Sequence, residues 1–198
     1  MSEIHLPEKE RETMSKICDV GTDKVFPEIR EVQDSDVNKA LRRLTEGMQT
    51  LACGFATGYV DHRQLVQNAD NIRSASAQLP PRLNEGDSEL VTKVCDINGR
   101  EVVPLIDQLQ DYREISEIPA YFDVKSTMGC ALNAVQDVAC NYKELAKEPA
   151  ASLRIDETAM LESADCIERF AETLNSLKQS GMQKSYLEKY GPLHPPRE

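Results

Sequence analysis

Apolar residues recur every three or four positions along five stretches of this chain, each about twenty residues long. This spacing places the apolar side chains on one face of an α-helix, so it predicts long helices that pack side by side. The clearest stripe follows Asp34, Ser35 and Asp36, which are candidate N-caps. Its members are Val37, Leu41, Leu44, Met48, Leu51, Phe55 and Tyr59.

The clearest stripe predicts a helix over residues 36–59, and the other four predict helices over 62–79, 87–112, 120–147 and 156–181. A shorter apolar pattern predicts a short helix over residues 7–20. Alternating β-branched runs are missing, so no strand is predicted. The helix over 120–147 carries apolar or small residues on more than one face, which is typical of a helix covered by neighbours on both sides. It is therefore expected to be central.

Glycine and proline mark the expected interruptions. Gly21 ends the first helix, and Pro80 ends the third. In the fourth helix, the apolar phase continues across Asn98 and Gly99. We therefore favour one long helix with a kink at Pro104 over two unrelated helices.

These elements predict an all-α protein, an antiparallel up-and-down helical bundle of four to six helices. Residues 1–35 are expected to form short N-terminal helices that pack on the bundle, and residues 36–181 the main bundle. Residues 182–198 are expected to form a short helical turn and a disordered Pro-rich tail. The tail, Pro192 to Arg197, could adopt polyproline II and dock in an SH3-type groove; an unstructured end is the alternative.

The third helix is the least hydrophobic, with the stripe Leu65, Ala69, Ile72, Ser76 and Leu79. It contributes less apolar burial than the others and is expected at an edge of the bundle. If it lifts, it exposes a groove between its neighbours, which is the receptor half of helix-in-groove recognition. Leu65, Ile72 and Leu79 are the predicted partner-binding residues, and a plain covering helix is the alternative.

Charge restricts the class of partner. The chain of 198 residues has a formal net charge of −11, and its acids are scattered along helical faces. Nucleic acid is excluded as a partner because phosphate binding needs a basic stripe. A protein partner with a basic surface fits this charge better. No stretch is long and apolar enough to span a membrane. A homodimer is compatible with the apolar stripes, since one of them could form a dimer seam.

Six cysteines lie on or beside the apolar stripes without a CxxC pair: Cys18, Cys53, Cys95, Cys130, Cys140 and Cys166. This placement favours reduced cysteines in the core. The amino terminus lacks a charged leader followed by an apolar run. Together these features predict a cytoplasmic protein.

No motif indicates catalysis, and no catalytic, cofactor-binding or metal-binding residue is predicted. Of three histidines, His5 and His194 are terminal, and His62 is most simply a residue of a helix-capping turn. A nucleophile built from Cys53 and His62 has no supporting signature. The Glu-x-x-His pairs of di-iron bundles are missing, so no metal or other cofactor is expected.

The sequence therefore predicts a non-enzymatic adaptor or regulatory module that binds a protein partner through a helix face or a groove between helices. A small-molecule or lipid carrier with a pocket in the bundle core is one alternative, and an enzyme of unrecognised type is another. A carrier should enclose an apolar cavity, whereas an adaptor should have a filled core.

Overall fold

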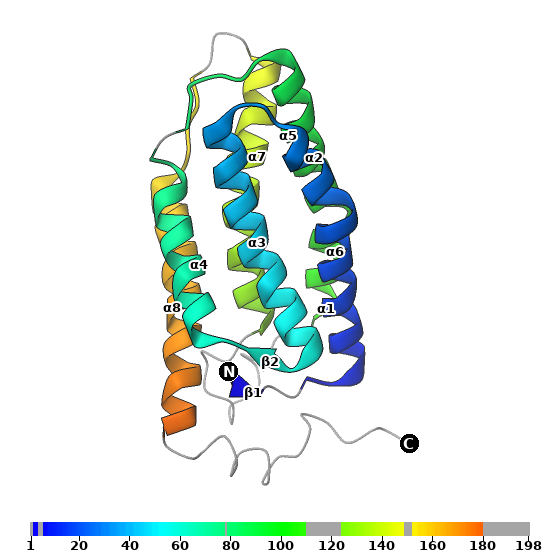
Figure 1. The fold of residues 1–198 in the computed structure, drawn as a ribbon, viewed down its shortest axis with the longest axis vertical. Helices are drawn as coiled ribbons and strands as arrows, with labels where there is room; N and C mark the ends of the chain where they lie inside the picture. The colour runs from blue at the N-terminus through cyan, green and yellow to red at the C-terminus, as the bar shows by residue number, and fades with distance from the viewer. Residues whose placement is uncertain (1, 4–5, 78, 110–123, 149–151, 180–198) are drawn as a thin grey trace.

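A computed structural model describes residues 2–3, 6–77, 79–109, 124–148 and 152–179. The chain forms an elongated bundle whose helices run along its long axis (Figure 1). The helices are α1 (Glu8–Val20), α2 (Phe26–Glu31), α3 (Ser35–Thr57), α4 (His62–Ala75), α5 (Glu85–Ile97), α6 (Val103–Asp107), α7 (Val124–Lys147) and α8 (Glu157–Gln179). The predicted all-α bundle is confirmed.

The helices are arranged in three antiparallel pairs (Figure 1). Helix α4 packs on α8, and α3 packs on α7. The continuous helical segment from α1 to α2, called the first rod, packs on the continuous segment from α5 to α6, called the second rod. The α3–α7 pair lies between the other two pairs, so it contributes to two four-helix bundles at once. This position confirms that the helix over 120–147 is central, and it explains why both α3 and α7 bury many small residues.

The first rod does not end at Gly21, and that prediction was wrong. The chain passes through a π-helical turn, Gly21–Val25, and continues into α2. Pro27 follows, and its ring would clash with the Asp23 carbonyl in a regular α-helix. The wider turn, in which the Phe26 amide donates to the Gly21 carbonyl, lets the helix accommodate the proline.

The second rod has the same construction. A π-helical turn, Asn98–Val102, joins α5 to α6, and the Val103 amide donates to the Asn98 carbonyl. Pro104 is the second residue of α6, two positions after the turn. The prediction of one interrupted helix is confirmed as far as Asp107, but the helix ends there and not at 112: Gln108 lies in a turn and Leu109 in a bend, and residues 110–112 lie outside the described part of the chain.

Helix α3 has the ends that its sequence indicates. The Asp34 carboxylate accepts hydrogen bonds from the amides of Asp36 at 3.1 Å and Val37 at 3.0 Å. Gly58 ends the helix with φ of 80°, a left-handed conformation that favours glycine. Tyr59–Val60 (β2) then pairs with Ser2–Glu3 (β1) in a short antiparallel ladder, which the sequence did not predict.

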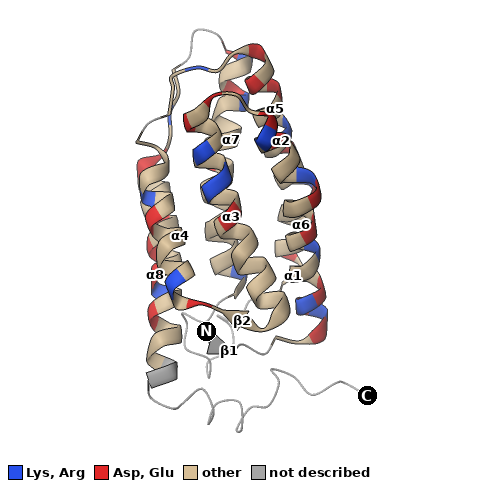
Figure 2. Ribbon diagram, in the orientation of Figure 1, with Lys and Arg blue, Asp and Glu red and all other residues tan. Residues whose placement is uncertain are grey.

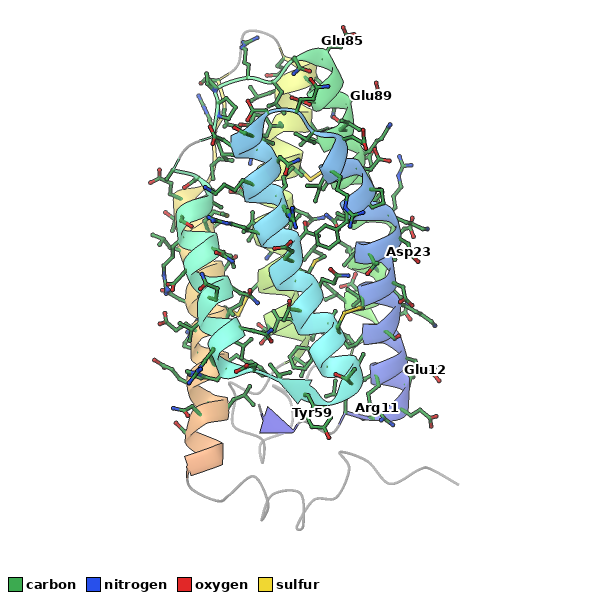
Figure 3. The ribbon with its side chains drawn as sticks, viewed as in Figure 1. Arg11, Glu12, Asp23, Tyr59, Glu85 and Glu89 are labelled. Carbon is green, nitrogen blue, oxygen red and sulfur yellow. A yellow bond between two sulfur atoms is a disulfide. The ribbon has the colours of Figure 1, made fainter. Side chains whose placement is uncertain are left out.

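The prediction of reduced cysteines was wrong. The structure forms three disulfides, Cys18–Cys53, Cys95–Cys140 and Cys130–Cys166, and no cysteine remains free (Figure 3). Their Cα–Cα distances are 5.4, 5.1 and 6.5 Å. Each bond joins neighbouring helices far apart in sequence, so a local search for CxxC pairs could not reveal it.

The two halves of the chain, residues 8–75 and 85–179, repeat one three-helix unit. Residues 16–29 read KICDVGTDKVFPEI and residues 93–106 read KVCDINGREVVPLI, so the cysteine, the π-helical turn and the proline coincide. In both halves this rod is disulfide-bonded to the next long helix, by Cys18–Cys53 or by Cys95–Cys140. Self-similarity at this scale indicates a repeated supersecondary unit.

The buried positions of the other helices correspond one for one. Helix α3 buries Val37, Ala40, Leu41, Leu44, Thr45, Gly47, Met48, Leu51, Ala52 and Phe55. Helix α7 buries, at identical spacing, Val124, Thr127, Met128, Ala131, Leu132, Ala134, Val135, Val138, Ala139 and Tyr142. Leu65, Asn68, Ala69 and Ile72 of α4 correspond in the same way to Met160, Ser163, Ala164 and Ile167 of α8.

Asp87 connects the second rod to the turn between α2 and α3. Its carboxylate accepts hydrogen bonds from the backbone amides of Gln33 at 2.7 Å and Asp34 at 2.9 Å, and only 2% of the residue is exposed. Asn84 caps α5, since its side chain accepts a hydrogen bond from the Asp87 amide. The Asp87 carboxylate therefore satisfies backbone donors of the other half of the chain.

We expect Asp87→Ala to lower the free energy of unfolding by about 2–3 kcal/mol, because two partly buried amides lose their acceptor. Asp36→Ala is the matched control: it removes one exposed carboxylate that lies two residues after Asp34, one of the two residues whose amides Asp87 accepts from. Urea denaturation followed by circular dichroism measures both. Equal losses in the two variants would contradict a specific role for Asp87.

Candidate functional site

Helix α4 lies at one side of the bundle, where it packs along α8 and against α3 (Figure 1). Leu65 and Ile72 point into this contact, with 1% and 3% of their surfaces exposed. Leu79 lies beyond the helix, which ends at Ala75 instead of at 79, and is half-buried against the core. A partner can therefore reach Leu65 and Ile72 only when α4 moves away.

Helix α4 is held by fewer large apolar side chains than its counterpart α8. The buried apolar residues of α4 are Leu65, Ala69 and Ile72. Those of α8 are Met160, Ala164, Ile167, Phe170, Ala171 and Leu174. Since burying one large apolar side chain contributes about 1.5–3 kcal/mol, α4 has the smaller hydrophobic contribution of the two.

The disulfides reinforce this difference. Cys130–Cys166 ties α8 to α7, whereas the equivalent positions of the first half are Arg43 and Asn71. Both residues line a surface groove of about 260 Å³ between α3 and α4. Among the long helices of the described residues, α4 is thus the only one without a disulfide.

Polar contacts hold α4 in place instead. The Asn68 side chain, 8% exposed, donates a hydrogen bond of 3.2 Å to the Gly47 carbonyl of α3. A side chain at Gly47 would meet Asn68 at 3.0 Å, so this glycine permits the close crossing of α3 and α4. Exchangeable hydrogen bonds of this kind, unlike a disulfide, can break and re-form as a helix moves.

Arg73 of α4 forms ion pairs with Asp165, at 2.8 Å, and with Glu168, both of α8. These hydrogen bonds raise the pKa of Arg73 above its usual value. The pairs are partly exposed, and such surface pairs contribute little to stability. They position α4 on α8 and do not fix it there.

A second groove, of about 860 Å³, lies on the outer face of α7 and α8. Its walls carry the Cys130–Cys166 disulfide and the polar side chains of Asn133, Asp137 and Arg169. Burial raises the pKa of Asp137, although Asn141 donates a hydrogen bond to one of its carboxylate oxygens. A backbone hydrogen bond from Asp156 also lowers this pKa, but burial outweighs both contacts.

We expect Asp137→Asn to stabilise the protein at pH 7, because the ionised carboxylate is disfavoured in the folded state. Because the folded pKa is raised, the wild type loses stability relative to the Asn variant as the pH rises through that pKa. Below about pH 3.8 Asp137 is protonated in both the folded and the unfolded wild type, so the advantage of the Asn variant should vanish. Asp96→Asn is the opposite control, since the hydrogen bond from Lys143 lowers the pKa of Asp96. This variant should be less stable at pH 7, and unfolding midpoints from pH 3 to 7 test both signs.

The geometry gives little support to the two alternative functions, a small-molecule or lipid carrier and an enzyme. A pocket of about 540 Å³ beside Tyr142 mixes apolar Leu83, Leu145 and Ala146 with charged Arg82, Glu85 and Glu89, so it differs from the apolar core cavity expected of a carrier. Cys53 is bonded to Cys18, so it is no free nucleophile for His62. Within the described residues, no cluster of metal-ligating side chains and no helix able to cross a membrane is found.

Acidic and basic residues alternate over the outer faces of the helices, without a basic stripe on the face in view (Figure 2). Arg11 and Glu12 illustrate this mixture near one end of the bundle (Figure 3). The Pro-rich tail, Pro192 to Arg197, lies outside the described part of the chain. The expected absence of nucleic-acid binding stays a prediction.

The sequence pattern identified α4 as weakly hydrophobic, but its lack of a disulfide, which distinguishes it most, was not predicted. The signal was present: Lys16, Cys18 and Asp19 are repeated at 93, 95 and 96. The repeat places Cys18 and Cys53 at the positions equivalent to Cys95 and Cys140, so both pairs are expected to form the same bond. Cys130 and Cys166 remain as a third pair that only the second half has. The comparisons add no relative, because no family model, no curated protein and no solved structure matches this chain.

Proposed function

We propose that the protein is a non-enzymatic interaction module in which α4 acts as a lid over a binding groove. When α4 moves, the faces of α3 and α8 that it covers form a hydrophobic groove, and an amphipathic helix of a partner protein binds there. The observation that carries this proposal is the absence of a disulfide at Arg43 and Asn71, where the second half has Cys130–Cys166.

The partner helix should resemble α4 in its chemistry. It needs medium-sized apolar residues at the spacing of Leu65, Ala69 and Ile72 to fill the same space. Asp165 and Glu168 lose Arg73 when α4 leaves, so a basic residue on the partner helix restores their ion pairs. The net charge of −11 further favours a basic partner surface.

A peptide of residues 61–77 is a direct probe of this groove, because it carries the α4 stripe itself. A fluorescent form of the peptide should bind the full-length protein, and anisotropy measures the affinity. Binding to the oxidised Arg43→Cys/Asn71→Cys variant, in which a disulfide holds α4, should be at least tenfold weaker. Arg43→Ser/Asn71→Ser is the matched control and should bind as the wild type does; equal affinity for all three proteins contradicts the lid.

Three disulfides support an oxidising compartment as the place where this module works, since thiols in the cytosol are kept reduced. They weigh against the cytoplasmic localisation expected from the sequence. Under the proposal, binding partners are sought among proteins of secretory or extracellular spaces. Fractionation of the native cell, with thiol labelling of this chain in each fraction, tests the compartment.

A further inference from the structure

We infer that the face each half buries is a self-complementary surface whose partner is a second copy of the same three-helix unit. In one chain the two halves satisfy each other. Two chains can also exchange halves, so that residues 8–75 of one chain pair with residues 85–179 of the other. This inference does not depend on the opening of α4.

The contacts between the halves carry the signature of two-fold pairing. In such an interface, equivalent elements meet: α3 packs on α7, α4 on α8 and the first rod on the second rod. Residues near the axis contact their own counterparts. Lys24 and Glu101 occupy equivalent positions and form an ion pair at 2.6 Å. Arg73 and Glu168 are equivalent too, and they also pair.

The orientation of the halves agrees with this relation. Glu12 of α1 and Glu89 of α5 occupy equivalent positions in the repeat. They lie near opposite ends of the bundle (Figure 3), as a two-fold axis perpendicular to the helices requires. The rods are therefore related by rotation and not by simple translation along the bundle.

No disulfide joins one half to the other. Cys18–Cys53 lies in the first half, and Cys95–Cys140 and Cys130–Cys166 lie in the second. Only the connection over residues 76–84 links the halves covalently. It contains Pro80, whose carbonyl accepts a 2.6 Å hydrogen bond from the hydroxyl of Tyr142. Exchange of halves therefore needs rearrangement of this connection and leaves every disulfide intact, a low-cost route to a dimer.

The test mixes two full-length variants, Lys24→Cys and Glu101→Cys. They are unfolded together without reductant at about pH 5, where thiol–disulfide exchange is slow, so that the native disulfides stay intact. The mixture is then refolded at high protein concentration. A short bismaleimide then links neighbouring thiols. We expect a species of twice 22.2 kDa that persists on dilution and is cross-linked between chains, at least tenfold more abundant than in a mixture never unfolded. The Lys24→Cys/Glu101→Cys double variant, cross-linked within one chain, standardises the yield.

Two further variants sharpen the result. Deletion of residues 80–83 shortens the connection between the halves and should convert the folded protein to the dimer. The oxidised Arg43→Cys/Asn71→Cys protein should exchange halves as readily as the wild type, since its added bond lies within one half. Refolding that gives only monomers at every concentration overturns the inference. So does a dimer of the mixed single variants in which the bismaleimide fails to link the thiol introduced at position 24 of one chain to the thiol introduced at position 101 of the other. Loss of peptide binding by the locked variant concerns the lid alone, so the two proposals fail separately.

Discussion

Oxidised Arg43→Cys/Asn71→Cys protein is expected to unfold with a free energy about 3 kcal/mol higher than that of the wild type. The new disulfide would join α3 to α4 at the positions equivalent to Cys130 and Cys166, and it closes a loop long enough to stabilise by this amount. Both side chains line the same groove, and the equivalent residues Cys130 and Cys166 are bonded with their Cα atoms 6.5 Å apart, so we expect the new bond to form without moving the helices. Guanidinium denaturation of the oxidised variant measures the gain.

The control for this variant is Arg43→Ser/Asn71→Ser, which removes the same side chains without adding a bond. Arg43 is exposed, so its loss should change the stability by less than about 0.5 kcal/mol. If the oxidised cysteine variant is no more stable than the serine control, α3 and α4 do not have the geometry of α7 and α8. The correspondence between the halves would then fail at this point.

The reverse change should remove the covalent link between α7 and α8. We expect Cys130→Ser/Cys166→Ser to lower the free energy of unfolding by about 2–5 kcal/mol, the range for loss of a native disulfide. Helix α8 should keep its position because Phe170, which packs edge-on against Phe55 with ring centroids 5.6 Å apart, and its other apolar residues still pack on the core. Circular dichroism should therefore show an unchanged helix content, with a lower unfolding midpoint.

Cys95→Ser/Cys140→Ser is the comparison for that experiment. It removes a disulfide that both halves possess, between a rod and a central helix. Its loss should destabilise the protein by a similar amount but leave α8 as protected from hydrogen exchange as in the wild type. Protection of α8 that falls equally in both variants would mean that Cys130–Cys166 has no local role.

The sequence predicted elements wherever local chemistry decides them. Helix α3 was expected over 36–59 and spans 35–57, because Asp34 caps one end and Gly58 the other. The central place of α7 followed from its small and apolar faces. Gly21 misled the prediction, since glycine ends a helix only when the chain adopts the left-handed conformation; here it remains right-handed inside a π-helical turn.

Features that depend on tertiary packing were not accessible from a single periodic stripe. The disulfides join positions that become neighbours only when the helices pack, for example Cys18 and Cys53 across α1 and α3. The apolar stripe of α4 correctly marked Leu65 and Ile72 as inward-facing, but it could not show that their helix is unbridged. That distinction needs the comparison of one half of the chain with the other.

Hydrogen exchange of the full-length protein, followed by mass spectrometry, measures directly whether α4 opens, because it compares α4 with α8 in one molecule. If α4 is a lid, we expect its backbone amides to exchange at least tenfold faster than those of α8, through local opening, and the oxidised Arg43→Cys/Asn71→Cys protein to lose this difference. The contrary result is equal protection of α4 and α8 in the wild type. In that case α4 is a fixed part of the bundle and not a lid.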